Sequence, residues 1–261
     1  MRKLTLIVVS LLLYACATSP MGRNQLILFP EGEMAQMGAA AFQDLQGELR
    51  VSDDAATNAY VRCVADAVLR TVPGERPEDW EVKVFEDSSA NAFALPGRKI
   101  GVHTGLLEVA EDQSQLATVI GHEIAHVMAK HSNERVSTNY VTQSGLQLAS
   151  IVAGNDTPMK RQLFGLLGLG AQVGVLLPFS RAQEAEADLM GLELLAEAGF
   201  DPRASVRLWQ NMQAQGGDRP PEFLSTHPSS ERRISELNAR MREAMQTSSQ
   251  ARLAGRVPDC R

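Results

Sequence analysis

The order of apolar and polar residues predicts a chain built mainly from amphipathic helices. Apolar side chains recur at three- and four-residue steps, which is the period of a helix that buries one face. A segment that alternates between apolar and polar residues lies among these helices and indicates a strand. The predicted helices cover residues 31–46, 52–69 (with its cap at Ser52-Asp53), 105–110 (capped by Thr104), 112–131, 136–152 and 162–177.

A small sheet is predicted immediately before the helix at 112–131. Residues 80–85 alternate between apolar and polar side chains, as a half-buried strand does. Residues 91–94 and 99–102 flank Pro96-Gly97, a turn dipeptide, so these two segments should form a hairpin. The sequence therefore predicts a fold of mixed class in which helices dominate.

Length and composition place the chain among folded globular proteins. Its 261 residues suffice for one large domain or two small ones. Hydrophobic residues make up 44% of the chain and charged residues 21%, which is the balance of a protein with a packed core. The net charge is −6, and Lys and Arg occur only in scattered pairs, so no nucleic acid is expected as a partner.

The first residues resemble the leader of a bacterial lipoprotein. Arg2 and Lys3 precede an apolar run over 4–13, which is too short to span a bilayer as a helix. Leu13-Tyr14-Ala15-Cys16 follows and is similar to a lipobox, in which cleavage before the cysteine leaves that residue lipidated. An ordinary signal peptide with a chance cysteine is the alternative.

This leader predicts membrane attachment through a lipid on Cys16. Residues 1–15 are then a signal peptide and residues 16–30 a tether. Ala17 is not an aspartate, so the resemblance points to the outer membrane. The expected location is that of an outer-membrane lipoprotein that faces the periplasm.

Two further cysteines remain in the mature chain, Cys63 and Cys260. Cysteines of an exported protein pair more often than not, because the compartment is oxidising. Neither residue has the spacing of a metal site. We expect a disulfide that ties the C-terminal tail to an early helix.

The helix at 112–131 carries the residues that point to chemistry. His122 and His126 lie one turn apart and project from one face, and Glu123 falls about 100° from the first and about 60° from the second. In this H-E-x-x-H arrangement the histidines bind zinc and the glutamate is the general base for the metal-bound water. Two surface histidines with an incidental glutamate are the alternative. His131 lies about 140° off the ligand face, so we expect it to be solvated or to cap the helix.

A later segment offers the third protein ligand that such a zinc site needs. Glu184 and Asp188 share one face of a predicted helix, whereas Glu186 points about 200° away and is expected to be a surface acid. Glu184 should bind the metal, and Asp188 should accept the second ring N–H of a ligand histidine. An alanine-rich surface helix is the alternative. One zinc ion per chain, held by His122, His126 and Glu184, is predicted.

Four motifs between residues 91 and 234 occur together in this chain. They are Asn91-Ala92-Phe93-Ala94 with Pro96-Gly97, His122-Glu123-Ile124-Ala125-His126, Glu184-Ala185-Glu186-Ala187-Asp188, and Thr226-His227-Pro228 followed by Arg233-Ile234. This combination resembles the M48 family of zinc metallopeptidases, and more narrowly its bacterial periplasmic lipoprotein members. The chain departs from the pattern at Arg98, where many relatives carry a second glycine.

The resemblance implies a mainly α, α+β fold of gluzincin-like type. The metallopeptidase domain should cover 31–261, with a small antiparallel sheet or hairpin beside the active-site helix. An exposed sheet edge can take an extended peptide as an added strand, and the expected substrate strand is Asn91-Ala92-Phe93-Ala94. A purely structural hairpin is the alternative.

His227 is the remaining histidine of a family motif, and Pro228 holds it at an extended position. If its loop folds over the zinc, the imidazole has two possible roles. It could donate to the oxyanion of the reaction, or it could occupy the open zinc position and block the enzyme. We favour the blocking role; a helix-capping histidine remote from the metal is the third interpretation.

The expected function is that of a zinc-dependent endopeptidase in protein quality control at the envelope. Glu123 would take the proton of the attacking water and return it to the leaving amine. Unfolded or misassembled envelope proteins are the expected substrates, and the outer-membrane assembly machinery is a possible partner. The alternative is a zinc-stabilised chaperone or assembly factor for outer-membrane proteins with little proteolysis.

Overall fold

The computed structural model describes residues 16–152, 179–215, 222–227 and 231–260, and within them the fold is mainly helical. The predicted signal peptide and the helix predicted over 162–177 lie outside these residues. The longer helices are α2 (Glu31–Glu48), α3 (Ala55–Leu69), α5 (Gln113–Met128), α6 (His131–Val152), α9 (Arg181–Glu197), α10 (Ala204–Gln215) and α12 (Glu231–Leu253). Shorter helices are η1 (Pro77–Asp79), α4 (Thr104–Val109) and α11 (Glu222–Thr226). A helical fold with a small sheet is therefore confirmed.

The sheet contains β3 (Glu81–Phe85), β4 (Ala92–Leu95) and β5 (Lys99–His103) in the order β3-β5-β4. β4 and β5 form the predicted antiparallel hairpin, but β3 pairs with β5 in parallel, so the sheet is mixed. The reason is that β5 inserts between β3 and its successor β4. Within the described chain β4 is consequently an edge strand, and it faces α5.

The hairpin turn combines two left-handed residues, Gly97 with φ 86° and Arg98 with φ 63°. Gly97 also packs closely, because a Cβ there would lie 2.8 Å from the carbonyl oxygen of Ala35 in α2. An ion pair between Arg98 and Glu75, with Nε 2.6 Å from Oε2, offsets part of the strain of the left-handed backbone at Arg98. Arginine is thus accommodated where glycine is usual.

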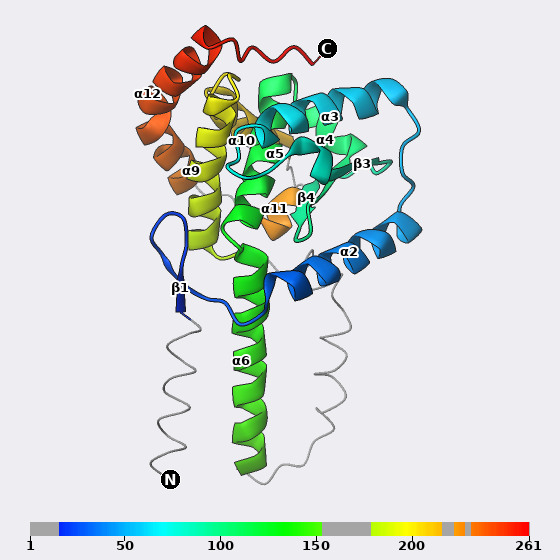
Figure 1. Cartoon of the computed structure of the whole chain (residues 1–261), viewed down its shortest axis with the longest axis vertical. Helices are drawn as coiled ribbons and strands as arrows, with labels where there is room; N and C mark the ends of the chain where they lie inside the picture. The colour runs from blue at the N-terminus through cyan, green and yellow to red at the C-terminus, as the bar shows by residue number, and fades with distance from the viewer. Residues whose placement is uncertain (1–15, 153–178, 216–221, 228–230, 261) are drawn as a thin grey trace.

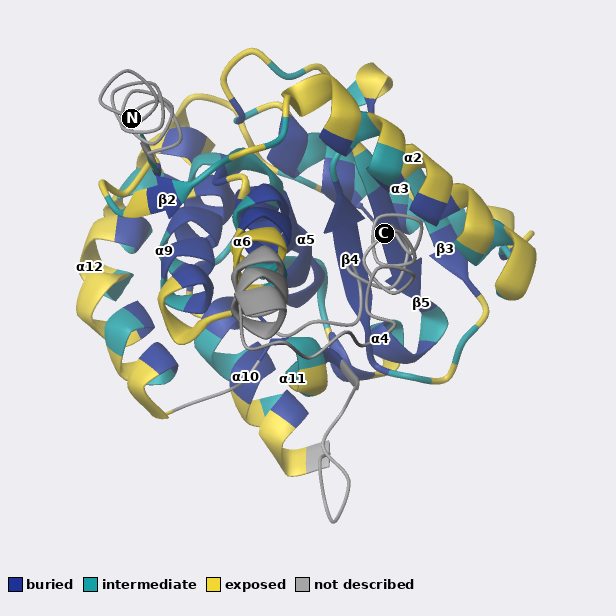
Figure 2. Ribbon diagram, turned by 90° about the horizontal axis from the view of Figure 1, so that it is seen from below, coloured by how far each residue is buried: buried dark blue, intermediate teal, exposed yellow. Residues whose placement is uncertain are grey.

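Helix α5 lies between the sheet and α9 and forms the centre of the core (Figures 1 and 2). Asp112 begins it by accepting hydrogen bonds from the backbone N–H groups of Ser114 and Gln115, both at 2.8 Å. Apolar side chains such as Leu116 and Ile120 are fully buried. α5 is therefore enclosed almost along its whole length, unlike a surface helix with one buried face.

Two helix boundaries differ from the predictions. Asp54 caps α3, in place of the predicted Ser52-Asp53, and accepts from the backbone N–H of Thr57 at 3.0 Å. The predicted helix through His131 ends at Met128, because Lys130 has a φ of 54° and turns the chain. His131 then begins α6, which projects away from the body of the molecule (Figure 1).

The segment predicted as a tether is packed against the domain instead. β1 (Cys16–Thr18) and β2 (Asn24–Leu26) pair as an antiparallel hairpin. Gln25 is buried, and Arg23 makes ion pairs with acids of α6 and α9. We call residues 16–26 the N-terminal hairpin. Of the helices in the described ranges, none has the length and apolarity needed to cross a membrane.

The C-terminus is held to the early part of the domain. Cys63 in α3 and Cys260 form a disulfide, and these are the two residues that the sequence pairs. The bond links positions 197 residues apart and fastens the tail beyond α12. Gln113 at the start of α5 also holds this segment, through hydrogen bonds with the carbonyl oxygen of Pro258 and the backbone N–H of Cys260, both at 3.0 Å.

Candidate metal centre

Helix α5 presents His122 and His126 as neighbours on one face. Their Nε2 atoms lie 3.0 Å apart, and the two side chains are almost completely buried. The surface-histidine alternative does not apply, since each residue is at most 2% exposed. The spacing of one helical turn accounts for this convergence.

Helix α9 brings Glu184 to the same point from a distant part of the sequence. Ser180 and Gln183 form a capping box that fixes the start of α9, so Glu184 lies in its first turn. Its Oε1 lies 3.4 Å from Nε2 of His126, and its Oε2 lies 3.6 Å from Nε2 of His122. Burial would raise the pKa of Glu184, but hydrogen bonds from His126 and His227 hold that pKa well below its usual range.

The two helices can approach because glycines meet at their crossing. A Cβ on Gly191 of α9 would lie 2.9 Å from the backbone nitrogen of His122, and one on Gly121 would lie 3.1 Å from the carbonyl oxygen of Gly191. Both are closer than side chains normally pack. The crossing therefore places the backbone of α9 directly against the metal-binding turn of α5.

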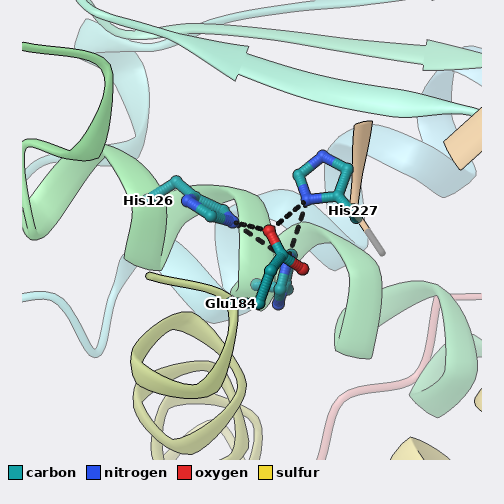
Figure 3. Close-up of side chains that lie close together, drawn as sticks. His126, Glu184 and His227 are labelled. Atoms are coloured by element: carbon teal, nitrogen blue, oxygen red, sulfur yellow. Dashed lines mark hydrogen bonds and ion pairs between the residues drawn. The ribbon is translucent and has the colours of Figure 1, made fainter. Parts of the chain in front are cut away.

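His227 also lies at this point, immediately after α11. Its Nδ1 is 3.0 Å from Oε1 of Glu184 and 3.2 Å from Nε2 of His122, and Figure 3 shows the ring turned toward Glu184 and His126. The imidazole stacks on Phe223, with ring centroids 4.3 Å apart. A helix cap remote from the centre, the third interpretation of this residue, is therefore wrong.

These four side chains form a donor set that suits a metal ion. One donor atom from each of His122, His126, Glu184 and His227 lies within 4.8 Å of the other three, and all four residues are buried. Bonds of about 2.0–2.1 Å in a tetrahedral site place ligand atoms about 3.4 Å apart. The observed separations of 3.0 to 3.6 Å agree with that geometry.

Glu123 lies beside the donor set, and one of its oxygens has no hydrogen-bond partner. The backbone N–H of Ala94 in β4 donates to Oε2 at 3.1 Å, while buried Oε1 faces Nε2 of His227 at 3.4 Å. Burial raises the pKa of this carboxyl group. Glu123 and His227 line a cavity of about 20 Å³ together with the predicted substrate strand, Asn91 to Ala94.

Asp188 lies behind His122, one turn beyond Glu184. Oδ1 of Asp188 is 3.1 Å from Nδ1 of His122, and Arg233 of α12 binds both Asp188 oxygens at 2.5 and 2.7 Å. Arg233 also reaches Oε2 of Glu184 at 2.7 Å. Burial opposes protonation of His122, but the hydrogen bond to Asp188 and the charge of Glu184 raise its pKa. The sequence motif contained Arg233 but did not indicate this contact.

His131 and Glu186 occupy positions that the sequence analysis did not predict. His131 is completely buried, with Nδ1 2.9 Å from Nδ1 of His126, so the prediction of a solvated or capping residue is wrong. The helix wheel failed because α5 ends before His131. Glu186 is 5% exposed and its Oε2 lies 3.2 Å from Nε2 of His131. It is not a surface acid, because the N-terminal hairpin covers that face of α9.

An aromatic side chain closes the other side of the centre. Phe179 stacks on His126 with centroids 3.8 Å apart, and the guanidinium of Arg135 lies 3.7 Å above the Phe179 ring. Neither residue belongs to a metal-ligand type, so no sequence signal indicated them. Burial lowers the pKa of Arg135 to about 10, which leaves it charged at neutral pH.

The centre agrees with what comparison with known proteins shows. Residues 55–241 match peptidase family M48. The chain is 35% identical over 223 residues to mitochondrial metalloendopeptidase OMA1 of Schizosaccharomyces pombe, covering 85% of this chain and 64% of that protein. The OMA1 protein of Arabidopsis thaliana is 40% identical over 155 residues, which cover 59% and 30% of the two chains. The β-barrel assembly-enhancing protease of Escherichia coli is 29% identical over 217 residues, covering 80% and 44%.

These matches confirm the family that the sequence predicted, peptidase family M48. The chain spans 64% or less of the length of these relatives. They also contradict one prediction: the relatives of higher identity are named as mitochondrial proteins, so the assignment to the outer membrane as a lipoprotein facing the periplasm is wrong. The lipid on Cys16 stays a prediction from the sequence.

Proposed function

Because the chain belongs to peptidase family M48, we propose that it is a zinc-dependent endopeptidase of protein quality control. One observation carries the proposal above the others: a buried glutamate with a free carboxylate oxygen lies beside a four-residue donor set. A structural metal site has no need of such a base. The proposed ligands of a single zinc ion are His122, His126 and Glu184.

The chain's own residues supply the proton transfers of peptide hydrolysis. A bound zinc ion would act as a Lewis acid toward the scissile carbonyl and make a water more acidic. Oε1 of Glu123 accepts the proton of the attacking water and then delivers it to the nitrogen of the leaving amine. The raised pKa of Glu123 brings it nearer to neutral pH, which suits both steps.

Strand β4 is the proposed binding edge for the substrate. The N–H of Ala94 points toward Glu123 and away from β5, and the alternation of an antiparallel strand turns the backbone groups of Ala92 the same way. An extended peptide could pair with the backbone groups of Ala92 as an added strand, next to the Ala94 N–H that Glu123 already binds. Such pairing uses backbone hydrogen bonds and does not depend on particular side chains. The substrates we propose are therefore unfolded or misassembled polypeptides, which can present an extended segment.

His227 is proposed to hold the enzyme in a closed state. Its Nδ1 occupies the fourth corner of the donor set, where a water would otherwise approach the metal, and its Nε2 faces the free oxygen of Glu123. The blocking role therefore draws more support than the oxyanion role. Substrate or water can enter only when this ring leaves the position.

Substitution of Glu123 by glutamine tests the proposed function. The variant keeps the shape of the side chain and removes the base, so cleavage of an unfolded protein should fall by about 10²–10⁴. Glu108→Gln makes the same change on the exposed surface of α4 and should cleave like the wild type. Equal cleavage by Glu123→Gln at equal zinc content would exclude this mechanism.

An assembly factor with little proteolysis is the second candidate, and the name of the E. coli relative favours it. The same pair of proteins decides between them. If wild type and Glu123→Gln hold zinc, cleave nothing and suppress aggregation of an unfolded protein equally, the second candidate replaces the first.

A further inference from the structure

The two histidines of α5 are held from behind by different groups. Nδ1 of His122 faces a carboxylate directly, at 3.1 Å from Asp188. Nδ1 of His126 faces a third imidazole, at 2.9 Å from Nδ1 of His131. Behind His131 stands Glu186, with Oε2 at 3.2 Å from Nε2. His126 thus reaches its carboxylate through one intervening ring.

His126, His131 and Glu186 form a row of hydrogen-bonded side chains. The chemistry of these groups determines which ring nitrogens in the row carry a proton. An ionised Glu186 can only accept hydrogen bonds, so Nε2 of His131 carries a proton and donates a hydrogen bond to the carboxylate. In a neutral His131 the other nitrogen, Nδ1, is then an acceptor. His126 must donate to it from Nδ1, which leaves Nε2 of His126 with a free lone pair toward the donor set. The row selects the tautomer that a metal ligand requires.

The N-terminal hairpin holds the far end of this row. Nε of Arg23 donates to Oε2 of Glu186 at 3.1 Å, and the backbone N–H of Met21 donates to Oε1 at 3.2 Å. Arg23 also binds both oxygens of Glu134 in α6, at 2.5 and 2.6 Å. These contacts leave the Glu186 carboxylate fully engaged and only 4% exposed.

The N-terminal hairpin also fixes the turn between α5 and α6, which places His131 against His126. Nε2 of Gln25 donates to the carbonyl oxygen of Ala129 at 2.7 Å, at the turn between α5 and α6. That turn directs the chain back so that His131 lies against His126. Two separate contacts of the hairpin therefore converge on the placement of one imidazole.

We propose that His131 and Glu186 are positioning residues for the metal ligand His126, and that the N-terminal hairpin completes the metal centre through Arg23. Residues 16–26 then form part of the support of the site and do more than connect the domain to what precedes it. This inference rests on the zinc site proposed above, because it concerns the orientation of one of its ligands.

Zinc affinity, measured by competition with a chromogenic chelator on the full chain, tests the proposal. His131→Phe keeps a ring but removes both nitrogens, and zinc binding should weaken about ten- to a hundredfold, as loss of a ligand's hydrogen-bond partner does. His131→Asn is smaller but retains an acceptor near Nδ1, so its affinity should fall less. A role in packing alone predicts the opposite order of these two variants, and that order would overturn the proposal.

Two substitutions farther along the row extend the test without opening the core. Glu186→Gln and Arg23→Gln should each weaken zinc binding, by less than His131→Phe does. Glu193→Gln on the exposed face of α9 is the matched control and should leave the affinity unchanged. Unchanged zinc affinity in Glu186→Gln and Arg23→Gln would show that the N-terminal hairpin does not support the metal centre. A wild-type chain that binds no zinc would instead contradict the site itself.

Discussion

At the scale of single residues, the position of His227 in the donor set predicts that this side chain regulates activity. A histidine that blocks the centre must leave before catalysis, so His227→Ala should raise the rate of cleavage of an unfolded protein. Ser225→Ala on α11 serves as the control. A fall in kcat by about 10²–10³ with zinc retained would identify an oxyanion donor instead.

His131 predicts a pH dependence of stability. Burial lowers its pKa to about 4 from the ordinary value of 6.5, so between these pH values the unfolded chain binds a proton that the folded chain does not bind. The unfolding free energy of the metal-free protein should therefore be highest above pH 6.5. It should fall by about 3 kcal/mol as the pH decreases toward 4.

Urea unfolding at several pH values, compared with His131→Asn, isolates this contribution. The difference in unfolding free energy between wild type and variant should shrink as the pH falls from 6.5 to 4. Two curves that stay parallel over this range would show that His131 is not held neutral by burial.

The sequence predicted residues whose relation lies within one helix. His122, Glu123 and His126 share a helix, as do Glu184 and Asp188, and the helical period fixes their directions. The positions of His131 and Glu186 depend on the turn between α5 and α6 and on the N-terminal hairpin that covers α9. No local sequence pattern contains either feature. The contact of Arg233 with Asp188 is of the same kind, because it joins α12 to α9.

At the scale of elements, the crossing of α5 and α9 determines the distance between ligands. Gly191→Ala would place a Cβ 2.9 Å from the backbone of His122, so the helices must move apart. We expect a loss of stability of about 1–3 kcal/mol. Zinc affinity should fall as well, because Glu184 moves with α9.

Gly32→Ala in α2 is the matched control for this prediction. A Cβ there meets no atom within 4 Å, so the change should stabilise the protein slightly. Thermal unfolding and chelator competition on both variants provide the measurements. A Gly191→Ala protein with unaltered zinc affinity would show that the crossing does not set the ligand geometry.

Elements were predicted better than their connections. The period of apolar residues located the helices from α2 to α6, since burial of one face imposes it, and the turn dipeptide Pro96-Gly97 located the hairpin; α10 was not predicted. The parallel pairing of β3 with β5 was missed, because strand order depends on non-local contacts. The N-terminal hairpin was missed for the same reason: its polar residues bond to α6 and α9, and apolar periodicity records none of this.

At the scale of the whole molecule, the disulfide predicts a stability that depends on redox conditions. The loop closed by Cys63 and Cys260 spans 197 residues, and the chain-entropy model assigns it about 5 kcal/mol, with measured gains usually smaller. The Cys63→Ser/Cys260→Ser variant should unfold at a lower temperature than the oxidised wild type. With reductant the two should coincide; labelling of both thiols in unreduced wild type would refute the bond.

The metal centre joins three separate parts of the chain, α5, α9 and the residue after α11, so metal binding is a property of the folded whole. The central claim is that His122 and His126 hold a zinc ion together with Glu184. Metal analysis of the purified protein tests it most directly. We predict one zinc per chain in the wild type and almost none in His122→Ala/His126→Ala, with circular dichroism confirming that the variant is folded. Undiminished zinc in that double variant would contradict the account.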